Sequence, residues 1–509
     1  MASLLASMAK VGSGSFLSRV LGFIRDLVVA RVFGADAATD AFFVAFKIPN
    51  FARRLFAEGA FSAALVPILH EYREQPGLAV LKRFVDDMAG TLGAALLLLT
   101  ALGILCAPIL ILAFAPGFGA DASQFDLAVA MLRLTLPYLL FITLAAFAGS
   151  ILNTYEHFGV PAFTPVLLNL ILIGCALWLA PNLEQPILAL AWGVLIAGLV
   201  QLAFLLPFLK RLGLLPRPRL NPRDPGVKRV FRQIGPAILG GSAGQISLLL
   251  NTLLASFLTT GSISWLYYAD RLMEFPLGIL AVALGTAIMP RLSQRHAARD
   301  PAAFSATLDW ALRLVLLLGL PSAIGLLALS GPLMATLFHS AEFGGEDVAM
   351  AARGLMAYSL GVVAFMAIKV LIPGYYARQD IGTPVRIAMV ALSVGLIANL
   401  VLMVPLGHAG LALGTTIAAT VNAALLLRGL RREGIYRPAR GWRRRLVQGL
   451  TASLAMGLLL SWGTGPTADW IAASGAERVW NLVTWILAGG LFYVAALGAT
   501  GVRPGDLRP

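Results

Sequence analysis

Charged side chains inside long apolar stretches are the residues of this chain whose types could do chemistry. Placing one charged residue at the centre of a bilayer costs about 2.5–3.5 kcal/mol on insertion scales, so a surplus of them indicates a function. The planar guanidinium of arginine forms paired hydrogen bonds with phosphate oxygens, which lysine cannot do. The pattern favours binding of a pyrophosphate or a sugar phosphate. The stretches near residues 10–33, 39–66 and 263–290 contain Arg19, Arg25, Asp26, Arg31, Asp40, Lys47, Arg53, Arg54, Glu58, Asp270, Arg271 and Glu274.

Two pairs among these charges have the spacing of ion pairs on one helix face. Arg271 and Glu274 are three residues apart, and Arg54 and Glu58 are four apart. Residues at these separations are neighbours on a helix surface. Such pairs could simply neutralise each other, without a further role.

The remaining basic residues divide into two groups. Long basic side chains near helix ends can reach the membrane interface, and we expect this of Arg31 and Lys47. The other arginines outnumber the carboxylates on their helices. We expect a water-filled cavity to be lined by Arg19, Arg25, Arg53 and Arg271.

The stretches that must position these residues make up most of the chain. Of 509 residues, 59% are hydrophobic and 13% are charged, whereas a soluble domain carries about 25% charged residues. Runs of roughly 20 apolar residues are long enough to cross a bilayer. We therefore predict an all-α polytopic membrane protein with about fourteen spans, near residues 10–33, 39–66, 86–114, 127–153, 160–181, 187–209, 233–258, 263–290, 307–330, 350–374, 384–405, 409–427, 446–463 and 480–500.

Lys and Arg alternate between the connections of these spans. The connections near residues 116–126, 181–186, 259–264 and 339–347 contain neither residue. Because cytoplasmic loops carry the excess of Lys and Arg, we predict that both termini are cytoplasmic. The same loops account for much of the net charge of +14 without nucleic acid as a partner. The basic connections hold Arg73, Lys82 and Arg83, a cluster over 210–232, Arg291, Arg295 and Arg299, Arg378 and Arg386, and a run over 428–445.

An internal repeat relates the two halves of the chain. AFSAALVPIL at residues 60–69 matches ALGTAIMPRL at residues 283–292, with Pro67 over Pro290. We call the separation of these two prolines the repeat offset. Parallel repeats are a known transporter architecture with the binding site at the repeat interface. We predict two six-helix lobes, residues 1–220 and 221–435, followed by a C-terminal helix pair at residues 436–509.

Enzymatic and metal-dependent alternatives have little support in the sequence. There is no GxxxxGK[ST] loop for a nucleotide, and the five histidines lack metal-ligand spacing. Cys106 and Cys175 lie in separate apolar runs, which favours plain packing. No hydrophilic stretch is long enough for a separate catalytic domain. We therefore expect a transporter rather than an enzyme, with no cofactor.

Longer motifs give the chain a resemblance. The segment SRVLGFIRD (18–26), with the segments ATDAFFVAFKIPN (38–50) and RRLFAEGAF (53–61), resembles the MurJ (MviN) family of lipid II flippases. GPAIL (235–239), SWLYYADRLMEFP (264–276) and PGYYARQDIGTP (373–384) look like the same family in the same order. The resemblance covers essentially the whole chain.

That resemblance implies a fold, a substrate and a site. The fold is that of the multidrug/oligosaccharidyl-lipid/polysaccharide exporter superfamily: two lobes around a central cavity, with the C-terminal pair forming a groove for a lipid tail. The substrate is undecaprenyl-pyrophosphate-linked disaccharide pentapeptide, crossing the bacterial inner membrane for peptidoglycan synthesis. The family's cavity arginines fall on Arg19, Arg25, Arg53, Arg54 and Arg271. The accompanying polar and gating positions are Asp26, Asp40, Glu58, Ser264, Asp270 and Glu274.

The chain departs from relatives that look sodium-coupled through carboxylates. Its stretches 233–258 and 384–405 offer only Asn251 and Asn399 as weak ligands, whereas a hard cation prefers carboxylate and carbonyl oxygens. Coupling to a monovalent cation is therefore in doubt. A membrane potential acting on cavity charges stays open, at about 2.3 kcal/mol per charge per 100 mV.

Three functional hypotheses remain. The first is an alternating-access flippase for lipid II, surrounded by membrane lipids and working beside other cell-wall synthesis proteins. The second is a scaffold that binds the lipid precursor without moving it. The third is a multidrug exporter, for which a more apolar cavity is expected.

Overall fold

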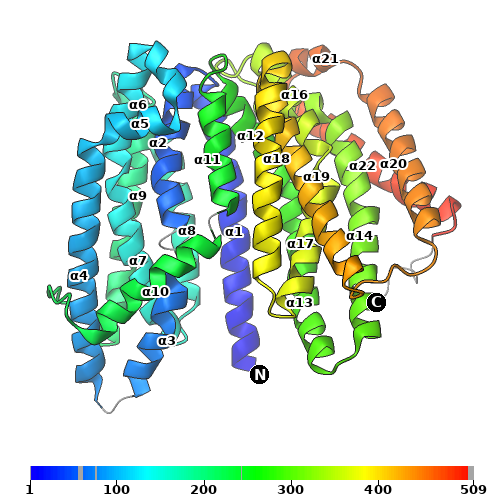
Figure 1. The fold of residues 1–509 in the computed structure, drawn as a ribbon. Coiled ribbons are helices and arrows are strands. Elements are labelled where there is room, and N and C mark those ends of the chain that lie inside the picture. The colour runs from blue at the N-terminus through cyan, green and yellow to red at the C-terminus, as the bar shows by residue number, and fades with distance from the viewer. Residues whose placement is uncertain (1, 55–60, 75–76, 242, 503–509) are drawn as a thin grey trace. The chain divides into compact units, whose positions relative to one another are not determined.

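The computed structural model describes residues 2–54, 61–74, 77–241 and 243–502. Over these residues the chain consists of helices and short connections, with no strand (Figure 1). Its contacts divide it into two compact units, residues 1–260 and 261–509. The predicted all-α class is confirmed.

The first unit begins with one long helix, and most later helices start at a proline or a capping side chain. Asp36 accepts a hydrogen bond from the Thr39 amide at 2.8 Å, and Pro137 fills the first turn of its helix, where its missing N–H costs nothing. The helices are α1 (Ala2–Phe33), α2 (Ala37–Arg53), α3 (Phe61–Glu74), α4 (Leu78–Leu105), α5 (Ala107–Phe114), η2 (Pro116–Ala120), α6 (Ala122–Thr135), α7 (Pro137–Thr154), α8 (Gly159–Gly174), η3 (Cys175–Leu179), η4 (Ala180–Asn182), α9 (Leu188–Arg211), α10 (Pro225–Gly241) and α11 (Ala243–Ala255). Within this unit α1 packs on α8, α2 on α6, and α7 on α9.

The second unit starts at Gly261, whose φ of 91° suits a residue without a side chain. Its helices are α12 (Ser262–Pro276), η5 (Leu277–Ala281), α13 (Val282–Ala297), α14 (Pro301–Ala328), α15 (Ser330–Leu337), α16 (Gly345–Ser359), α17 (Val362–Tyr376), α18 (Gly382–Leu406), α19 (His408–Arg432), α20 (Trp442–Thr464), α21 (Thr467–Ala472) and α22 (Gly475–Ala499). Here α18 packs on α19, α12 on α16, and α14 on α20.

Membrane-spanning helices dominate both units. Among the described residues, ten helices are long and apolar enough to cross a membrane, or eleven if α16 and α17, bent by 44° at their junction, form one span. The three other expected spans correspond to α1, to α2 with α3, and to α10 with α11. These segments carry the surplus charges, or are described as helices shorter than 18 residues, such as α10 with 17 and α11 with 13. The count of fourteen stays a prediction.

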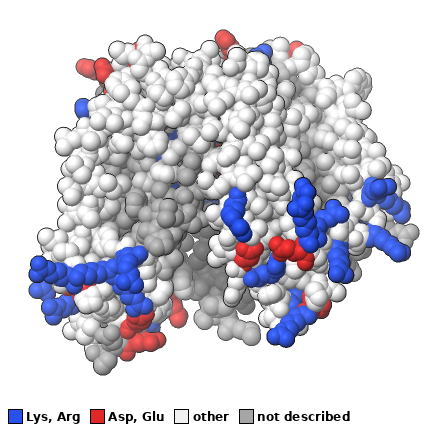
Figure 2. Space-filling model, viewed as in Figure 1, with Lys and Arg blue, Asp and Glu red and all other residues white. Residues whose placement is uncertain are grey.

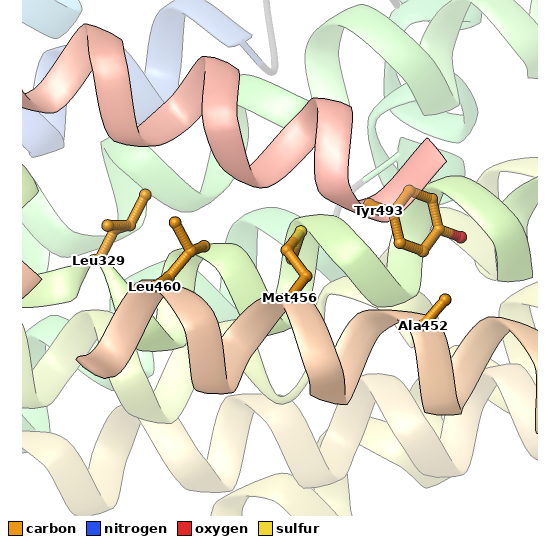
Figure 3. Close-up of a cluster of buried hydrophobic side chains, with 5 residues drawn as sticks. All are labelled: Leu329, Ala452, Met456, Leu460 and Tyr493. Atoms are coloured by element: carbon orange, nitrogen blue, oxygen red, sulfur yellow. The ribbon is translucent and has the colours of Figure 1, made fainter. Parts of the chain in front are cut away.

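The last two long helices pack on the second unit. Ala452, Met456 and Leu460 recur every four residues on α20 and form a buried cluster with Leu329 and with Tyr493 of α22 (Figure 3). The Tyr493 hydroxyl donates to the Leu317 carbonyl of α14 at 2.6 Å. Helices α20 and α22 therefore belong to the second unit, while the separate boundary at residue 436 and the lipid-tail groove stay predictions.

Helix starts in the two units are separated by the repeat offset. Helix α4 begins at Leu78 and α14 at Pro301, the same distance along the chain as from Pro67 to Pro290. The repeat offset also separates the starts of α5 and α15, of α6 and α16, and of α8 and α18. Corresponding helices thus begin at corresponding positions well beyond the segment that matches in sequence.

A buried aspartate holds a basic connection in the first unit. Asp86 of α4 accepts a hydrogen bond from the Arg217 amide at 2.6 Å through Oδ1 and one from the Arg219 amide at 3.0 Å through its carbonyl. Lys82 pairs with the same carboxylate. The α9–α10 connection is thereby fixed to α4, at the end of the unit where Lys and Arg gather (Figure 2).

A buried aspartate also fixes a basic connection to a helix in the second unit. Asp309 of α14 accepts hydrogen bonds at Oδ1 from the Tyr436 hydroxyl at 2.9 Å, the Ala439 amide at 3.1 Å and the Trp442 indole at 2.7 Å. Its Oδ2 lies 2.7 Å from Nε of Arg313. We call these two arrangements the Asp86 clamp and the Asp309 clamp.

Candidate functional site

Arg25 of α1 is held on two sides. Its Nη2 and Nε donate to Oδ1 of Asp26 at 2.6 and 3.0 Å, and its Nη1 donates to Oδ1 of Asn169 in α8 at 3.1 Å. Adjacent helix residues do not normally face each other, so the Arg25–Asp26 pair was not among the pairs that spacing suggested. The side chains of Arg25 and Asp26 are 12% and 2% exposed. Arg25 is therefore a fixed guanidinium in an almost buried setting.

Asn169 also fixes α1 itself. Its Nδ2 donates to the Ser18 carbonyl at 3.0 Å, and the amide packs against Gly22, where a Cβ would be in ordinary van der Waals contact with Nδ2 at 3.5 Å. One amide thus joins the backbone of α1 and the head group of Arg25. A side chain from α8 orients the candidate arginine.

The other charges of the first unit lie in varied settings. Arg19, Arg31 and Arg54 are exposed, and Asp40 is buried. Arg53 donates to Asn50 Oδ1 at 3.0 and 2.8 Å. Glu58 lies outside the described residues, so the Arg54–Glu58 pair stays a prediction.

Lys47 makes a contact that the sequence did not suggest. Its Nζ donates to the Thr252 hydroxyl of α11 at 2.8 Å, and that hydroxyl donates in turn to the Leu248 carbonyl at 2.9 Å. The ammonium group is thus engaged by a helix of its own unit, and its place at the membrane interface stays a prediction.

Arg271 is the candidate arginine of the second unit. Its Nη1 donates to Oε2 of Glu274 at 3.1 Å, which confirms the ion pair that the three-residue spacing predicted. Its Nη2 donates to the Tyr267 hydroxyl at 3.0 Å, and its guanidinium carbon lies 5.2 Å from the centre of that ring. The side chains of Arg271 and Glu274 are 34% and 55% exposed. On the same helix Ser264 is buried and Asp270 is half-buried.

The two fixed arginines have the same kind of environment. Both contact a carboxylate, Asp26 or Glu274, and a neutral polar side chain, Asn169 or Tyr267. An anion with several oxygens can replace a carboxylate at a guanidinium because both accept the same paired hydrogen bonds. This arrangement suits reversible binding of a phosphate. That Arg25 and Arg271 serve one shared site stays a prediction.

The two amides considered as cation ligands are on different units. Asn251 of α11 is half-buried, and Asn399 of α18 is buried beside Gly414, where a Cβ would come within 2.0 Å of Asn399 Oδ1. Within the described part of the chain, no three His, Cys, Asp or Glu side chains gather as metal ligands. Coupling through either amide stays a prediction.

Sequence reasoning missed the partners that orient these arginines. Tyr267 is four residues before Arg271, so helical spacing could have identified it. Asn169 is a polar residue in the apolar stretch of α8, which was a usable signal of a buried role. Its pairing with Arg25, 144 residues away, depends on tertiary structure.

Comparison with known proteins gives one consistent family. The sequence model described as "Lipid II flippase MurJ" matches residues 29–479. The chain is 44% identical to the lipid II flippase MurJ of Burkholderia cenocepacia over 507 residues, covering 98% of each protein. It is 43% identical to the probable lipid II flippase MurJ of Vibrio cholerae over 512 residues, covering 99% of this chain and 98% of the relative.

Solved structures agree with the sequence comparison. A structure of lipid II flippase MurJ in an inward closed conformation superposes with a TM-score of 0.80 at 25% identity, covering 96% of this chain and 97% of that one. An inward-facing multidrug resistance MATE transporter of the MOP superfamily superposes with a TM-score of 0.66 at 16% identity, covering 82% and 95%. The second likeness concerns the fold alone.

Proposed function

The chain belongs to the lipid II flippase MurJ family, and from that premise we propose that it moves lipid II from the cytoplasmic to the periplasmic leaflet of the bacterial inner membrane. The support is near-full-length identity of 44% and 43% to flippases. The observation that carries the proposal is the pair of fixed arginines, Arg25 and Arg271, each held by a carboxylate and a neutral polar side chain.

The proposed mechanism is alternating access without covalent chemistry. The pyrophosphate of lipid II takes the places that Asp26 and Glu274 occupy on Arg25 and Arg271, while Arg19, Arg53 and Arg54 add positive charge. When the head group leaves, the carboxylates return to the arginines. Asp40, Glu58, Ser264 and Asp270 complete the polar lining and take part in gating.

The proposed organisation is two lobes, residues 1–220 and 221–435, related by a parallel repeat. The repeat offset between helix starts supports it. The helix pair after residue 436 would guide the polyprenyl tail. The proposal has both termini in the cytoplasm because Lys and Arg gather in the α9–α10 and α19–α20 connections and at the helix ends that flank the α3–α4 and α13–α14 connections.

The driving force is proposed to act on the site charges, without a bound cofactor. A membrane potential would supply about 2.3 kcal/mol per charge per 100 mV. A monovalent cation gradient is the alternative. Imposing each gradient separately on vesicles separates the two.

The deciding experiment is head-group accessibility in vesicles that contain this protein alone. Lipid II added to one leaflet should become accessible to an impermeant reagent on the other side, and the R25K variant should slow this. Binding of lipid II with no change of accessibility under any imposed gradient would favour the scaffold hypothesis. Transport of apolar cations in place of lipid II would favour an exporter.

A further inference from the structure

The second unit contains a basic pocket that the proposed transport site does not use. It has a volume of about 310 Å³ and lies where α13, α14 and the α17–α18 connection meet. Arg295, His296, Arg299 and Arg378 line it, and Asp300 is the one acidic residue of the lining. Pro301, Phe304 and Ile435 give it an apolar portion. The pocket is thus both cationic and apolar.

The arginines of this pocket are only partly neutralised. Arg378 pairs with Glu433 at 2.7 Å, and Arg295 lies 4.0 Å from Asp300, at the limit of an ion pair. Within the described residues, the Arg299 guanidinium has no hydrogen-bond or ion-pair partner. The Arg299 backbone has a φ of 54°, in the left-handed region that residues with side chains seldom adopt. The turn after α13 therefore contributes a cation whose binding capacity is unused.

The corresponding positions of the first unit carry different residues with different contacts. At the repeat offset, the residues that correspond to Arg295, His296 and Arg378 are Tyr72, Arg73 and Tyr155. There Arg73 lies 4.8 Å from the centre of the Tyr155 ring and donates to the Thr154 carbonyl at 2.5 Å. These residues form a cation–π contact of their own. The sequence of the first unit thus does not repeat the arginines of the pocket at these positions.

The place of the pocket indicates the ligand. It lies among the basic connections that the distribution of Lys and Arg assigns to the cytoplasmic side. Anionic lipids lie in that leaflet, and basic pockets between membrane helices bind their head groups. Arginines suit the phosphate, and Phe304 with Ile435 suits the glycerol carbons.

We propose that the pocket lined by Arg295, His296, Arg299 and Arg378 binds the phosphate of an anionic diacyl phospholipid of the cytoplasmic leaflet. The proposal does not depend on which substrate the protein transports. It assigns Arg299 the main contact, because that residue loses no internal bond on binding. Arg378 would share its guanidinium between Glu433 and the lipid.

The test measures binding of phosphatidylglycerol to the intact protein in nanodiscs of neutral phosphatidylcholine. Each arginine near the membrane surface contributes about fivefold in affinity. The R299Q variant should therefore bind about fivefold more weakly, and R295Q/R299Q more weakly still. The matched control is R443Q/R444Q, which removes two exposed charges from the same unit outside the pocket.

Three results would overturn the proposal. The first is an equal loss of binding in R443Q/R444Q, which would mean general surface attraction. The second is displacement of phosphatidylglycerol by millimolar inorganic phosphate, which would mean a free-anion site. The third is weaker binding of lipid II in R295Q/R299Q with phosphatidylglycerol binding unchanged, which would mean an entry site for the transported lipid. Failure of flipping in the vesicle assay would leave this binding result unaffected.

Discussion

The Asp86 clamp and the Asp309 clamp hold equivalent connections with different chemistry. The two aspartates are separated by the repeat offset, and they fix the α9–α10 and the α19–α20 connection, respectively. Asp86 uses backbone amides and Lys82, whereas Asp309 uses a phenol, an indole, a backbone amide and Arg313. The carboxylate position follows from the fold, while its partners vary between units.

The position one turn further along each helix shows the same divergence. Gly90 of α4 lies directly under the connection, since a Cβ there would come within 2.3 Å of the Arg219 carbonyl oxygen. The corresponding residue, Arg313, donates to the Arg440 carbonyl at 3.2 Å. In the first unit the connection contacts the helix backbone, and in the second a long side chain fills the gap. The second clamp therefore depends more on charge.

The two fixed arginines, Arg25 and Arg271, differ in how far they are exposed, and here the first unit has the more buried charge. Arg25 is nearly buried with Asp26, whereas Arg271 and Glu274 are partly exposed. A buried pair is costly to break, while an exposed pair contributes little to stability. Stability and transport should therefore respond differently in the two units.

The largest expected effect is on the Asp309 clamp. Asp309→Asn presents an amide to Arg313 and removes the charge that holds three further donors. The expected cost is about 3–5 kcal/mol of unfolding free energy, as for a buried pair that loses one partner. Denaturant unfolding in detergent micelles measures it.

The matched variant is Asp86→Asn. Its amide oxygen can still accept from the Arg217 amide, its backbone carbonyl still accepts from the Arg219 amide, and only the pairing with Lys82 loses a charge. We expect a cost of about 0.5–1.5 kcal/mol. Equal costs for the two variants would contradict the stated difference between the clamps.

The next effect concerns Arg25. In Arg25→Lys one ammonium group replaces a fork that reaches Asp26 and Asn169 together, so we expect a loss of about 1.5–3 kcal/mol. Transport should fall at least tenfold, which corresponds to about 1.4 kcal/mol. Unfolding and the vesicle assay measure these two quantities.

Arg19→Lys is the control for this variant. Arg19 is on the same helix and exposed, so its substitution should leave the free energy of unfolding unchanged. Wild-type transport in R25K would rule out the requirement for a guanidinium fork at that position.

Arg271→Lys tests whether the arginine of the second unit affects stability less than Arg25 does. Because the pair with Glu274 is partly exposed, we expect a change of unfolding free energy below about 1 kcal/mol. Transport should nevertheless fall as in R25K, since both guanidiniums are proposed to bind the same pyrophosphate. Glu274→Gln, which keeps the shape of the partner, serves as its companion. A stability loss as large as that of R25K would remove the distinction drawn from exposure.

The sequence could predict the site arginines and the clamp aspartates, but not the side chains that contact them. Charges in apolar stretches identified Arg25 and Arg271, and the repeat offset places Asp86 over Asp309, although the matched segment did not extend that far. The Arg25–Asn169 contact and the partners of Asp309 join residues that are distant in the chain. Such contacts arise from helix packing, and no local periodicity encodes them.

The smallest expected effect is a dependence on alkaline pH that the Asp309 clamp gains through the Tyr436 hydroxyl. Burial, followed by the hydrogen bond to Asp309 and its negative charge, raises the pKa of Tyr436. The corresponding residue of the first unit is Gly213, so the Asp86 clamp has no equivalent hydroxyl. A group whose pKa is raised on folding stabilises the protein fully below its unfolded pKa, about 10 for tyrosine, and loses that contribution as pH rises toward its folded value. Between about pH 8 and pH 10 the stability difference between the wild type and Tyr436→Phe should therefore shrink by about 0.4 kcal/mol. The other tyrosines are common to both proteins and cancel in this difference, so a difference that stays constant over this range would contradict the role of the Tyr436 hydroxyl as a donor to Asp309.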